Sequence, residues 1–312
     1  MTRLYGLAML GAALLCTGCK EQPAPYTTAT TAKPTYTLKD TPEFCGENAY
    51  VHCAALCEIG PRPSGSAGYE KQLLYLTRYL EQYGWVVTRH SFTAPHGVNM
   101  TNLHAVYGKN AAPSQELLLT CHIDTKINVS ADFVGADDGA SGAAVLLELA
   151  RLLPATPFAG KIELVFFDGE EAVAERMTET DGLYGSRFDV ERRGEQLPLY
   201  QINLDMVGAR NKTIGVPLFD SAPELVEAYL ETVKDLKLNE NKWTVTDREY
   251  WDDDRHFREA GVATINLICD FVGSIWWHTP RDNMSRICPK SLQESGLVTL
   301  GLLHRILETK AQ

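Results

Sequence analysis

The sequence predicts an α/β fold in three layers, with a mixed, mainly parallel central sheet between two layers of helices. Two observations lead to this class. Apolar runs of strand length alternate with amphipathic runs of helix length, a pattern typical of parallel sheets covered on both faces. Polar motifs recur at regular spacing from about residue 100 onward, which favours a single domain in this chain of 312 residues.

The individual elements are predicted from periodicity and from the residues that interrupt it. In residues 69–83, Leu73, Leu76 and Leu80 recur at helical spacing, and Gly84 ends the run. A turn-rich segment at 60–66 separates this helix from the preceding one. Helices are expected at residues 44–58, 69–83, 140–153, 222–236 and 290–307. Strands are expected at residues 85–92, 101–107, 116–122, 161–167, 198–204 and 262–269.

The N-terminus predicts export. Residues 1–19 have Arg3 before an apolar run, at 4–15, that is too short to span a bilayer with ease. The run ends in Cys16-Thr17-Gly18-Cys19, which resembles the lipobox of bacterial lipoproteins, whose last cysteine is lipidated. An ordinary secretory signal cleaved near the same place is the alternative. We therefore expect a bacterial cell-envelope protein, lipid-anchored and facing the periplasm or the exterior, with no other contact to the membrane.

Composition limits the remaining domains and partners. Residues 20–40 are rich in Thr, Pro, Ala and Lys and predict a flexible tether, which leaves residues 41–312 as the catalytic domain. Forty acidic residues against 29 basic ones give a net charge of −11. This charge argues against nucleic acid as a partner, because phosphate binding needs a basic face.

Export makes disulfides possible, but the sequence does not choose among them. Six thiols allow fifteen full pairings. Cys53 and Cys57 lie four residues apart on an expected helix beside His52, where buried thiols or a disulfide to another segment are favoured over a metal clip. The six cysteines beyond the signal are Cys45, Cys53, Cys57, Cys121, Cys269 and Cys288.

Five short polar motifs carry the candidate chemistry. Each ends a strand-like run or opens a helix-like run, and strand ends of an α/β sheet meet at one edge, so the motifs can converge on one site. Two imidazoles with several carboxylates suit a hydrolytic type of zinc centre. The motifs occupy residues 121–124, 135–139, 168–171, 203–205 and 277–279.

The spacing within the motifs suggests a division of roles. His122 and Asp124 are two residues apart at a strand end, so that one could bind a metal while the other orients it. Asp137 and Asp138 precede an apolar helix among small residues; a helix cap would explain only one of them.

The acidic pair after the next strand suggests a second division. Of Glu170 and Glu171, one can ligate a metal while the other remains free as a proton carrier. Asp205 ends a further strand at the same edge, and crowded carboxylates cannot all ionise, so at least one pKa in this group should be raised. Trp277, next to His278, could wall off the pocket and exclude water.

Together these residues resemble the M28-type zinc peptidases and, within them, the glutaminyl-peptide cyclotransferases (glutaminyl cyclases). Residues 120–126 are similar to the cyclases' Ala-Cys-His-Tyr-Asp-Ser-Lys, and residues 166–172 match Phe-Phe-Asp-Gly-Glu-Glu-Ala. Residues 183–187 match Leu-Tyr-Gly-Ser-Arg, and residues 204–209 are similar to Leu-Asp-Leu-Ile-Gly-Ala. The resemblance extends from about Pro61 to the C-terminus and implies the M28 three-layer fold as a single domain.

The resemblance also implies roles for individual residues. One zinc ion is expected, with two as the alternative. The zinc ligands would be Asp138, Glu171 and His278. Glu170 would be the general base and acid, in a carboxylate hydrogen-bond network with Asp205 and Asp252. The pocket for the substrate's N-terminal glutamine would be lined by Ile268, Phe271 and Trp277.

The chain departs from the cyclases in several places. Alignment on Phe257 and Gly261 selects Asp252 for the network, whereas a shift of one residue selects Asp253. Residues 173–180 run about one residue longer than in the cyclases and lack their pocket tryptophan, and residues 135–142 are more similar to the aminopeptidase branch. The cyclase disulfide partner of Cys121 is missing, so this cysteine could be free.

Two reactions fit these residues. The preferred hypothesis is a zinc-dependent acyltransferase that converts the N-terminal glutamine of peptides or proteins to pyroglutamate and releases ammonia. The alternative is an M28 aminopeptidase with one or two zinc ions, in which His122 and Asp205 add ligands for a second ion and Asp124 supports them. A non-catalytic binding protein would require the loss of one of these residues, and none is missing. We expect a monomer.

Overall fold

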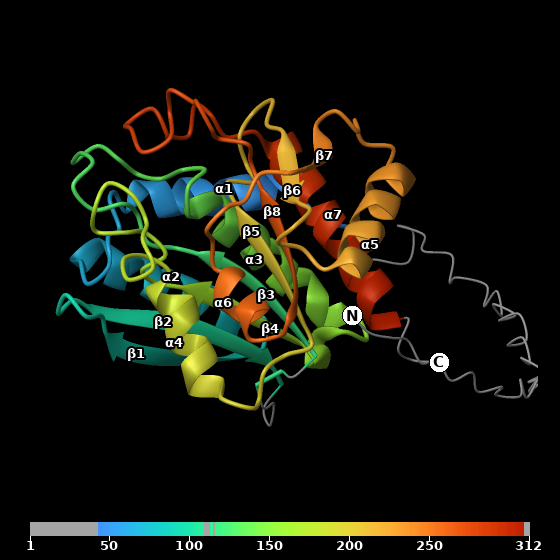
Figure 1. The fold of residues 1–312 in the computed structure, drawn as a ribbon, viewed down its shortest axis with the longest axis horizontal. Helices are drawn as coiled ribbons and strands as arrows, with labels where there is room; N and C mark the ends of the chain where they lie inside the picture. The colour runs from blue at the N-terminus through green and yellow to red at the C-terminus, as the bar shows by residue number, and fades with distance from the viewer. Residues whose placement is uncertain (1–42, 109–112, 115, 309–312) are drawn as a thin grey trace, which may run out of the picture. The chain divides into compact units, whose positions relative to one another are not determined.

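The computed structural model describes residues 43–108, 113–114 and 116–308 (Figure 1). Its centre is a six-stranded sheet in the order β1-β2-β4-β3-β5-β8. The β1–β2 and β2–β4 pairs are antiparallel, and the β4–β3, β3–β5 and β5–β8 pairs are parallel. The carboxyl ends of four strands therefore meet at one edge. The strands are β1 (Trp85–Thr93), β2 (Asn99–Tyr107), β3 (Leu117–His122), β4 (Ile162–Phe167), β5 (Tyr200–Asp205) and β8 (Ala263–Ile268).

Helices cover both faces of this sheet. One layer contains α1 (Gly46–Glu58), α2 (Ala67–Gln82), α3 (Ala140–Leu152) and α7 (Pro289–Glu308). The other face is covered by α4 (Tyr184–Arg193) and α6 (Arg255–Glu259), which lie in front of the sheet in Figure 1. Beyond β8, α5 (Pro223–Asp235) packs against α7. A small parallel sheet is formed by β6 (Ile214–Pro217) and β7 (Trp243–Thr246).

The two faces of the sheet differ in chemistry. Leu117, Leu119 and Cys121 of β3 belong to the large core that includes α1, α2, α3 and α7. Leu118 points to the opposite face, into a small cluster with Phe257 of α6. Successive side chains of a strand alternate between faces, so Thr120 lies on the α6 side together with Leu118. All six residues of β3 are buried, as expected for an inner parallel strand.

The predicted fold class is confirmed. Every helix and strand expected from the sequence is present, with bounds within two residues of those expected. The elements missed were α4, α6, β6 and β7, together with two short 3₁₀ turns, Leu153–Ala155 and Ala159–Lys161, between α3 and β4. The sheet is mixed because β1 and β2 join it in antiparallel orientation.

Several expectations fall on parts of the chain that the structure does not describe. The export signal at 1–19 and the tether at 20–40, with Cys16 and Cys19, lie outside the described residues. Within the described ranges, no helix is both long enough and apolar enough to cross a membrane. The six described cysteines are all free, Cys121 among them.

Candidate active site

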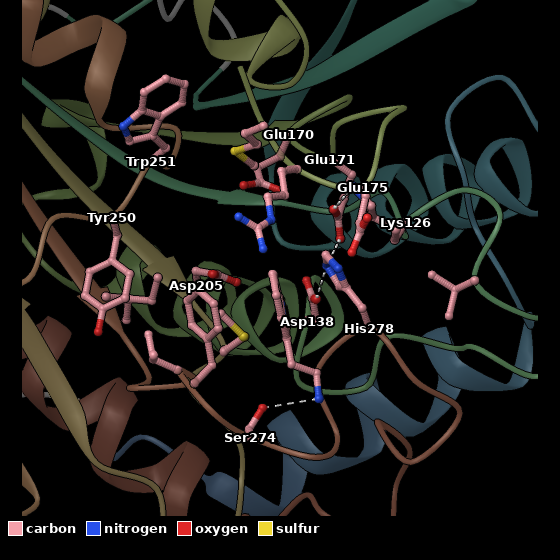
Figure 2. A pocket seen from close by; sticks show the side chains of 18 of the residues that line it. Lys126, Asp138, Glu170, Glu171, Glu175, Asp205, Tyr250, Trp251, Ser274 and His278 are labelled. Carbon is pink, nitrogen blue, oxygen red and sulfur yellow. Dashed lines mark hydrogen bonds and ion pairs between the residues drawn. The ribbon is translucent and has the colours of Figure 1, made fainter. Parts of the chain in front are cut away.

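A cavity of about 1150 Å³ opens at the edge where the parallel strands end (Figure 2). Four of the predicted motifs contribute to its lining. Glu170 and Glu171 follow β4, Asp205 ends β5, and Asp138 lies just before α3. His278 comes from the long loop after β8. Segments up to 140 residues apart in the sequence thus meet at one place, as the topology of parallel strands predicts.

Three of these side chains form a compact group suited to binding a metal ion. Asp138, Glu171 and His278 offer donor atoms that all lie within 4.8 Å of one another. His278 Nε2 is 3.1 Å from Glu171 Oε1 and 3.4 Å from Asp138 Oδ2. Asp138 Oδ2 is buried and makes no hydrogen bond within the described chain. One imidazole and two carboxylates, one of them with an oxygen lacking a hydrogen bond, fit a bound divalent cation of zinc type.

A second group shares Asp138 with the first. Its members are His122, Asp138 and Asp205, again with donor atoms within 4.8 Å of one another. His122 Nε2 lies 3.2 Å from Asp138 Oδ1 and 3.2 Å from Asp205 Oδ1. Because Oδ2 of Asp138 faces His278 and Oδ1 faces His122, this carboxylate stands between the two groups. The geometry therefore accommodates one cation or two.

Two further carboxylates hold the backbone of the acidic pairs. Asp124 accepts hydrogen bonds from the N–H groups of Glu170 and Glu171, each at 3.2 Å. Asp282 does the same for the next acidic pair, accepting from Asp137 N at 2.9 Å and Asp138 N at 3.0 Å. Each clamp fixes two consecutive peptide groups and so fixes the direction of the side chain that faces the cavity.

Close packing around His122 requires glycine at position 139. Gly139 has φ of 93°, in the region that L side chains rarely adopt. A Cβ atom at this position would lie 3.0 Å from the carbonyl oxygen of Asp124 and 3.2 Å from His122 Cε1. Glycine thus allows α3 to begin directly beside the imidazole.

Glu170 belongs to neither of the two candidate metal-binding groups, which we call the metal-type groups, and its carboxyl has a strongly shifted pKa. Burial raises the pKa of the Glu170 carboxyl well above its usual range; the His122 charge opposes this shift, and the charges of Glu171 and Asp252 add to it. Burial also raises the pKa of Asp205 to about 8, against the hydrogen bond from His122 and with a contribution from Asp252. Both groups are therefore suited to hold or transfer a proton near neutral pH.

Neighbouring carboxylates also shift the pKa of the His278 imidazole. Burial lowers its pKa, but the hydrogen bond with Glu171 and the negative charges of Asp138 and Glu171 outweigh burial and raise the pKa to about 9. The imidazole is held in an unusual backbone conformation, with φ of 51°. A non-glycine residue in this region carries strain, which is most often found at functional sites. This field of buried negative charge is the environment that a cation would neutralise.

The structure places the predicted pocket residues on the cavity wall. Ile268, Phe271 and Trp277 all line it. Trp277 stacks on His278 with ring centroids 3.8 Å apart, and Phe271 packs against Trp277 at 4.5 Å. The indole ring therefore covers one face of the His278 imidazole.

Several wall residues were missed by the sequence analysis. Lys126 donates a hydrogen bond to the carbonyl of Ala172 at 2.7 Å and lies 3.5 Å from Glu171 Oε2. Tyr250 and Trp251 line the cavity just before Asp252. The segment 173–177, which lacks the cyclases' pocket tryptophan, forms part of the wall. Lys126 stood within a quoted motif, but nothing in the sequence indicated which loops would face one another.

Asp252, the residue predicted to join the carboxylate network, is fixed by hydrogen bonds of its own. Asp252 is fully buried, and its two oxygens accept hydrogen bonds from Asp253 N at 2.7 Å and Asn266 Nδ2 at 2.8 Å. Its charge contributes to the raised pKa of both Asp205 and Glu170. Asp253 is buried as well, and its charge adds to the raised pKa of Glu170 together with that of Asp252. Asp252 rather than Asp253 as the partner of Asp205 stays a prediction.

Comparison with known proteins defines the class. The model of peptidase family M28 matches residues 102–303, and the chain belongs to this family. A glutaminyl-peptide cyclotransferase from Gloydius blomhoffii is 31% identical over 270 residues, covering 73% of this chain and 72% of the relative.

Solved structures agree with this assignment. The glutaminyl cyclase of Porphyromonas gingivalis is similar with a TM-score of 0.74 and 30% identity, over 83% of this chain and 98% of that one. A Zn-dependent exopeptidase from Parabacteroides distasonis is also similar, with a TM-score of 0.74 and 25% identity over 84% of this chain and 99% of that one. The relatives of this chain therefore include both cyclases and exopeptidases.

Proposed function

We propose that this protein is a zinc-dependent glutaminyl-peptide cyclotransferase, which converts N-terminal glutamine of peptides or proteins to pyroglutamate. The observation that carries the proposal is the position of Asp252. This buried carboxylate is held by two hydrogen bonds, and its negative charge adds to the raised pKa of Asp205. Asp205 is the residue that a second metal ion would require as a ligand. Such a partner favours Asp205 as a member of a proton-sharing carboxylate network over Asp205 as a metal ligand.

In this proposal Asp138, Glu171 and His278 hold one zinc ion, which when bound would supply a Lewis acid for the γ-amide carbonyl of the substrate. Glu170, which belongs to neither metal-type group, takes a proton from the α-amine. The amine nitrogen bonds to Cδ, the carbonyl carbon of the γ-amide, the bond from that carbon to the amide nitrogen breaks, and Glu170 returns the proton to the departing ammonia. The rings of Phe271 and Trp277 hold the glutamine in a reactive conformation and exclude water.

A second candidate function is supported by a specific observation. The group of His122, Asp138 and Asp205 is as compact as the first group, so an M28 aminopeptidase with two ions is the alternative. In that enzyme Glu170 would activate a water molecule for attack on the first peptide bond.

One pair of assays separates the two functions. The purified protein is incubated with Gln-Xaa peptides and with Leu-p-nitroanilide, and the products are analysed by mass spectrometry and absorbance. We expect the Gln peptides to lose one ammonia and to keep all their residues. Clipping of Leu-p-nitroanilide without cyclisation would reject the cyclase. Metal analysis of the same preparation tests one zinc ion against two; His278→Ala, which removes a ligand, should lose the ion.

We further propose that the enzyme acts in the bacterial cell envelope as a lipid-anchored monomer. The supporting feature is the sequence of residues 1–19, which ends in the lipobox-like Cys16-Thr17-Gly18-Cys19. Cys19→Ser should move the protein from the membrane fraction to the soluble fraction of lysed cells. Continued sedimentation with membranes would reject the anchor, and sedimentation analysis of the soluble form would test the monomer.

A further inference from the structure

Buried polar side chains form a continuous chain across three strands of the sheet, away from the cavity. Thr120 of β3, Asn203 of β5 and Asn266 of β8 are neighbours in the parallel register. Gln201, two residues before Asn203, lies on the same face. All four are 0–1% exposed, although parallel strands that are covered on both faces normally carry apolar residues. A buried polar group is costly unless it is hydrogen-bonded, so this departure from the expected pattern needs a reason.

The hydrogen bonds connect these residues in one line that ends on Asp252. Gln201 Nε2 donates to Thr120 Oγ1 at 3.0 Å, and Thr120 Oγ1 donates to Asn203 Oδ1 at 2.7 Å. Asn203 Nδ2 donates to Asn266 Oδ1 at 3.3 Å. Asn266 Nδ2 then donates to Asp252 Oδ2 at 2.8 Å. We call these five residues the polar ladder.

The direction of the ladder is fixed by its starting point. Gln201 Nε2 also donates to the backbone carbonyl of Asp253 at 3.3 Å, and a carbonyl can only accept. The amide group of Gln201 therefore presents its NH₂ to Thr120, which leaves the Thr120 hydroxyl hydrogen free for Asn203. Each following amide is oriented by the one before it, and the last presents NH₂ to Asp252. The ladder thus requires an acceptor at Asp252, which an ionised carboxylate provides.

The ladder also closes on itself. It begins at the carbonyl of Asp253 and ends at the carboxylate of Asp252, which in turn accepts from Asp253 N at 2.7 Å. Both residues of the Asp252-Asp253 dipeptide are therefore tied to strands of the sheet, Asp253 to β5 and Asp252 to β8. This arrangement restrains the position of one side chain.

We propose that the polar ladder is a positioning device, which holds the Asp252 carboxylate as an oriented hydrogen-bond acceptor beside Asp205 and Glu170. The inference rests on the proposed function, because Asp252 acts there through its two acidic neighbours. Thr120 and Asn203 touch neither substrate nor metal-type group; they act through Asn266 on the network.

The test compares two threonines on the same face of the sheet. Thr120→Val removes the hydroxyl within the ladder, and Thr120→Ser restores it. Thr264→Val is the matched control, since Thr264 of β8 is equally buried but bonds to the carbonyl of Asp220 at 3.2 Å and, at 3.5 Å, to Asp254 Oδ2, neither of which belongs to the ladder. We expect Thr120→Val to lower kcat by about three- to tenfold, the effect of one net buried hydrogen bond, with KM within twofold. Thr120→Ser should recover kcat, and Thr264→Val should leave it unchanged.

A second variant gives a readout that is independent of activity. Asn203→Leu breaks the ladder beside Asn266, and a crystal structure of this variant should show the Asp252 carboxylate rotated from its place. An Asp252 that stays in place, a kcat unchanged in Thr120→Val, or an equal fall in Thr264→Val would each overturn the positioning role. If Asp252 moves but the wild-type protein cyclises no glutamine peptide, the proposed function fails and the positioning inference stands.

Discussion

Individual carboxylates fix the geometry of this site by accepting hydrogen bonds from the backbone N–H groups of the acidic pairs. Asp124 and Asp282 each accept two consecutive N–H groups, and each thereby orients an acidic pair that faces the cavity. Asp282 has a further effect, because it lies four residues after His278 in the same loop. It therefore joins the segment that carries His278 to the segment that carries Asp138, two members of the metal-type group.

Replacement of Asp282 by asparagine should weaken metal binding without removing any metal-type donor. The asparagine NH₂ group cannot accept a hydrogen bond, so one of the two bonds to the Asp137-Asp138 backbone is lost. We expect zinc affinity to fall by about 10- to 100-fold, as for other groups that orient metal ligands. Competition with a chromophoric chelator measures this. Asp247→Asn, on an exposed loop, is the control, and equal affinities for the two variants would contradict the clamp.

Replacement of Glu170 by glutamine should separate proton transfer from metal binding. The side chain keeps its shape but can no longer accept and return a proton, so we expect kcat to fall by about 10²- to 10⁴-fold. Zinc content should stay at the wild-type value because Glu170 lies outside both metal-type groups. Steady-state kinetics with metal analysis checks both statements, with exposed Glu195→Gln as the control. Loss of zinc together with activity would assign Glu170 as a ligand instead.

The elements that could be predicted from sequence are those stabilised by apolar periodicity. In α3 every residue except Arg151 is buried, and its apolar sequence predicted both its position and its burial. In contrast, α4 buries Ser186, Asp189 and Arg193, which give no apolar stripe. Ion pairs take the place of that stripe: Arg193 bonds to Asp189 and to Glu163 of β4, each at 2.8 Å. Asp189 lies on α4 itself, but Glu163 lies 30 residues earlier in the sequence, so this part of the stabilisation could not be predicted.

The same distinction applies to the site. Motifs at strand ends could be predicted to converge, because parallel strands place their carboxyl ends together. The structure brings Asp138, Glu171 and His278 within ligand distance of one another, as the resemblance implied. The cavity wall could not be predicted, because loops such as 173–177 face their neighbours through contacts of long sequence range. The polar positions in β3, β5 and β8 were visible in the sequence, but their connection to Asp252 was not.

The wall loop after Glu171 is fixed by a third clamp of the same kind. Asp181 accepts hydrogen bonds from Val173 N at 2.7 Å and Ala174 N at 2.8 Å, and Tyr184 Oη donates to it at 2.8 Å. Although burial opposes it, these bonds hold the pKa of Asp181 below its usual range. Farther along, Glu179 pairs with Arg255, whose guanidinium lies 3.9 Å from the ring of Trp251 on the facing wall. The loop is thereby connected to the opposite side of the cavity.

Loosening this loop should affect substrate binding more than chemistry. Asp181→Asn removes one of the two N–H acceptors while Glu170, Glu171 and Asp205 keep their own contacts. We expect KM to rise by about three- to tenfold, the effect of one net hydrogen bond, and kcat to stay within twofold. Asp132→Asn, on an exposed loop outside the cavity lining, is the matched control. A fall in kcat at constant KM would show that the loop acts on the reaction itself.

At the scale of the whole molecule, the helical layer that supports the site contains a buried histidine. His52 of α1 is 7% exposed, and its Nδ1 is 2.7 Å from Tyr75 Oη of α2. Its ring also packs edge-on against Tyr79, with centroids 4.2 Å apart. Burial lowers the pKa of His52 to about 4, with only partial compensation from the charge of Glu148. The neutral imidazole is therefore part of the contact between the first two helices.

This histidine should make the fold sensitive to acid. Between pH 6.5 and about 4 the unfolded chain binds a proton at His52 that the folded chain does not, so stability falls as the pH falls through this window. The shift corresponds to at most about 3 kcal/mol at 1.36 kcal/mol per unit. His52→Phe, which cannot titrate, should flatten the dependence of the free energy of unfolding on pH, measured by urea denaturation at pH 7, 5.5 and 4.5. Replacement of His96, exposed on a turn, is the control and should leave the dependence unchanged. If both variants lose stability as steeply as the wild type, the acid sensitivity arises elsewhere; His90 of β1, whose pKa burial also lowers to about 4, would then be the next histidine to replace.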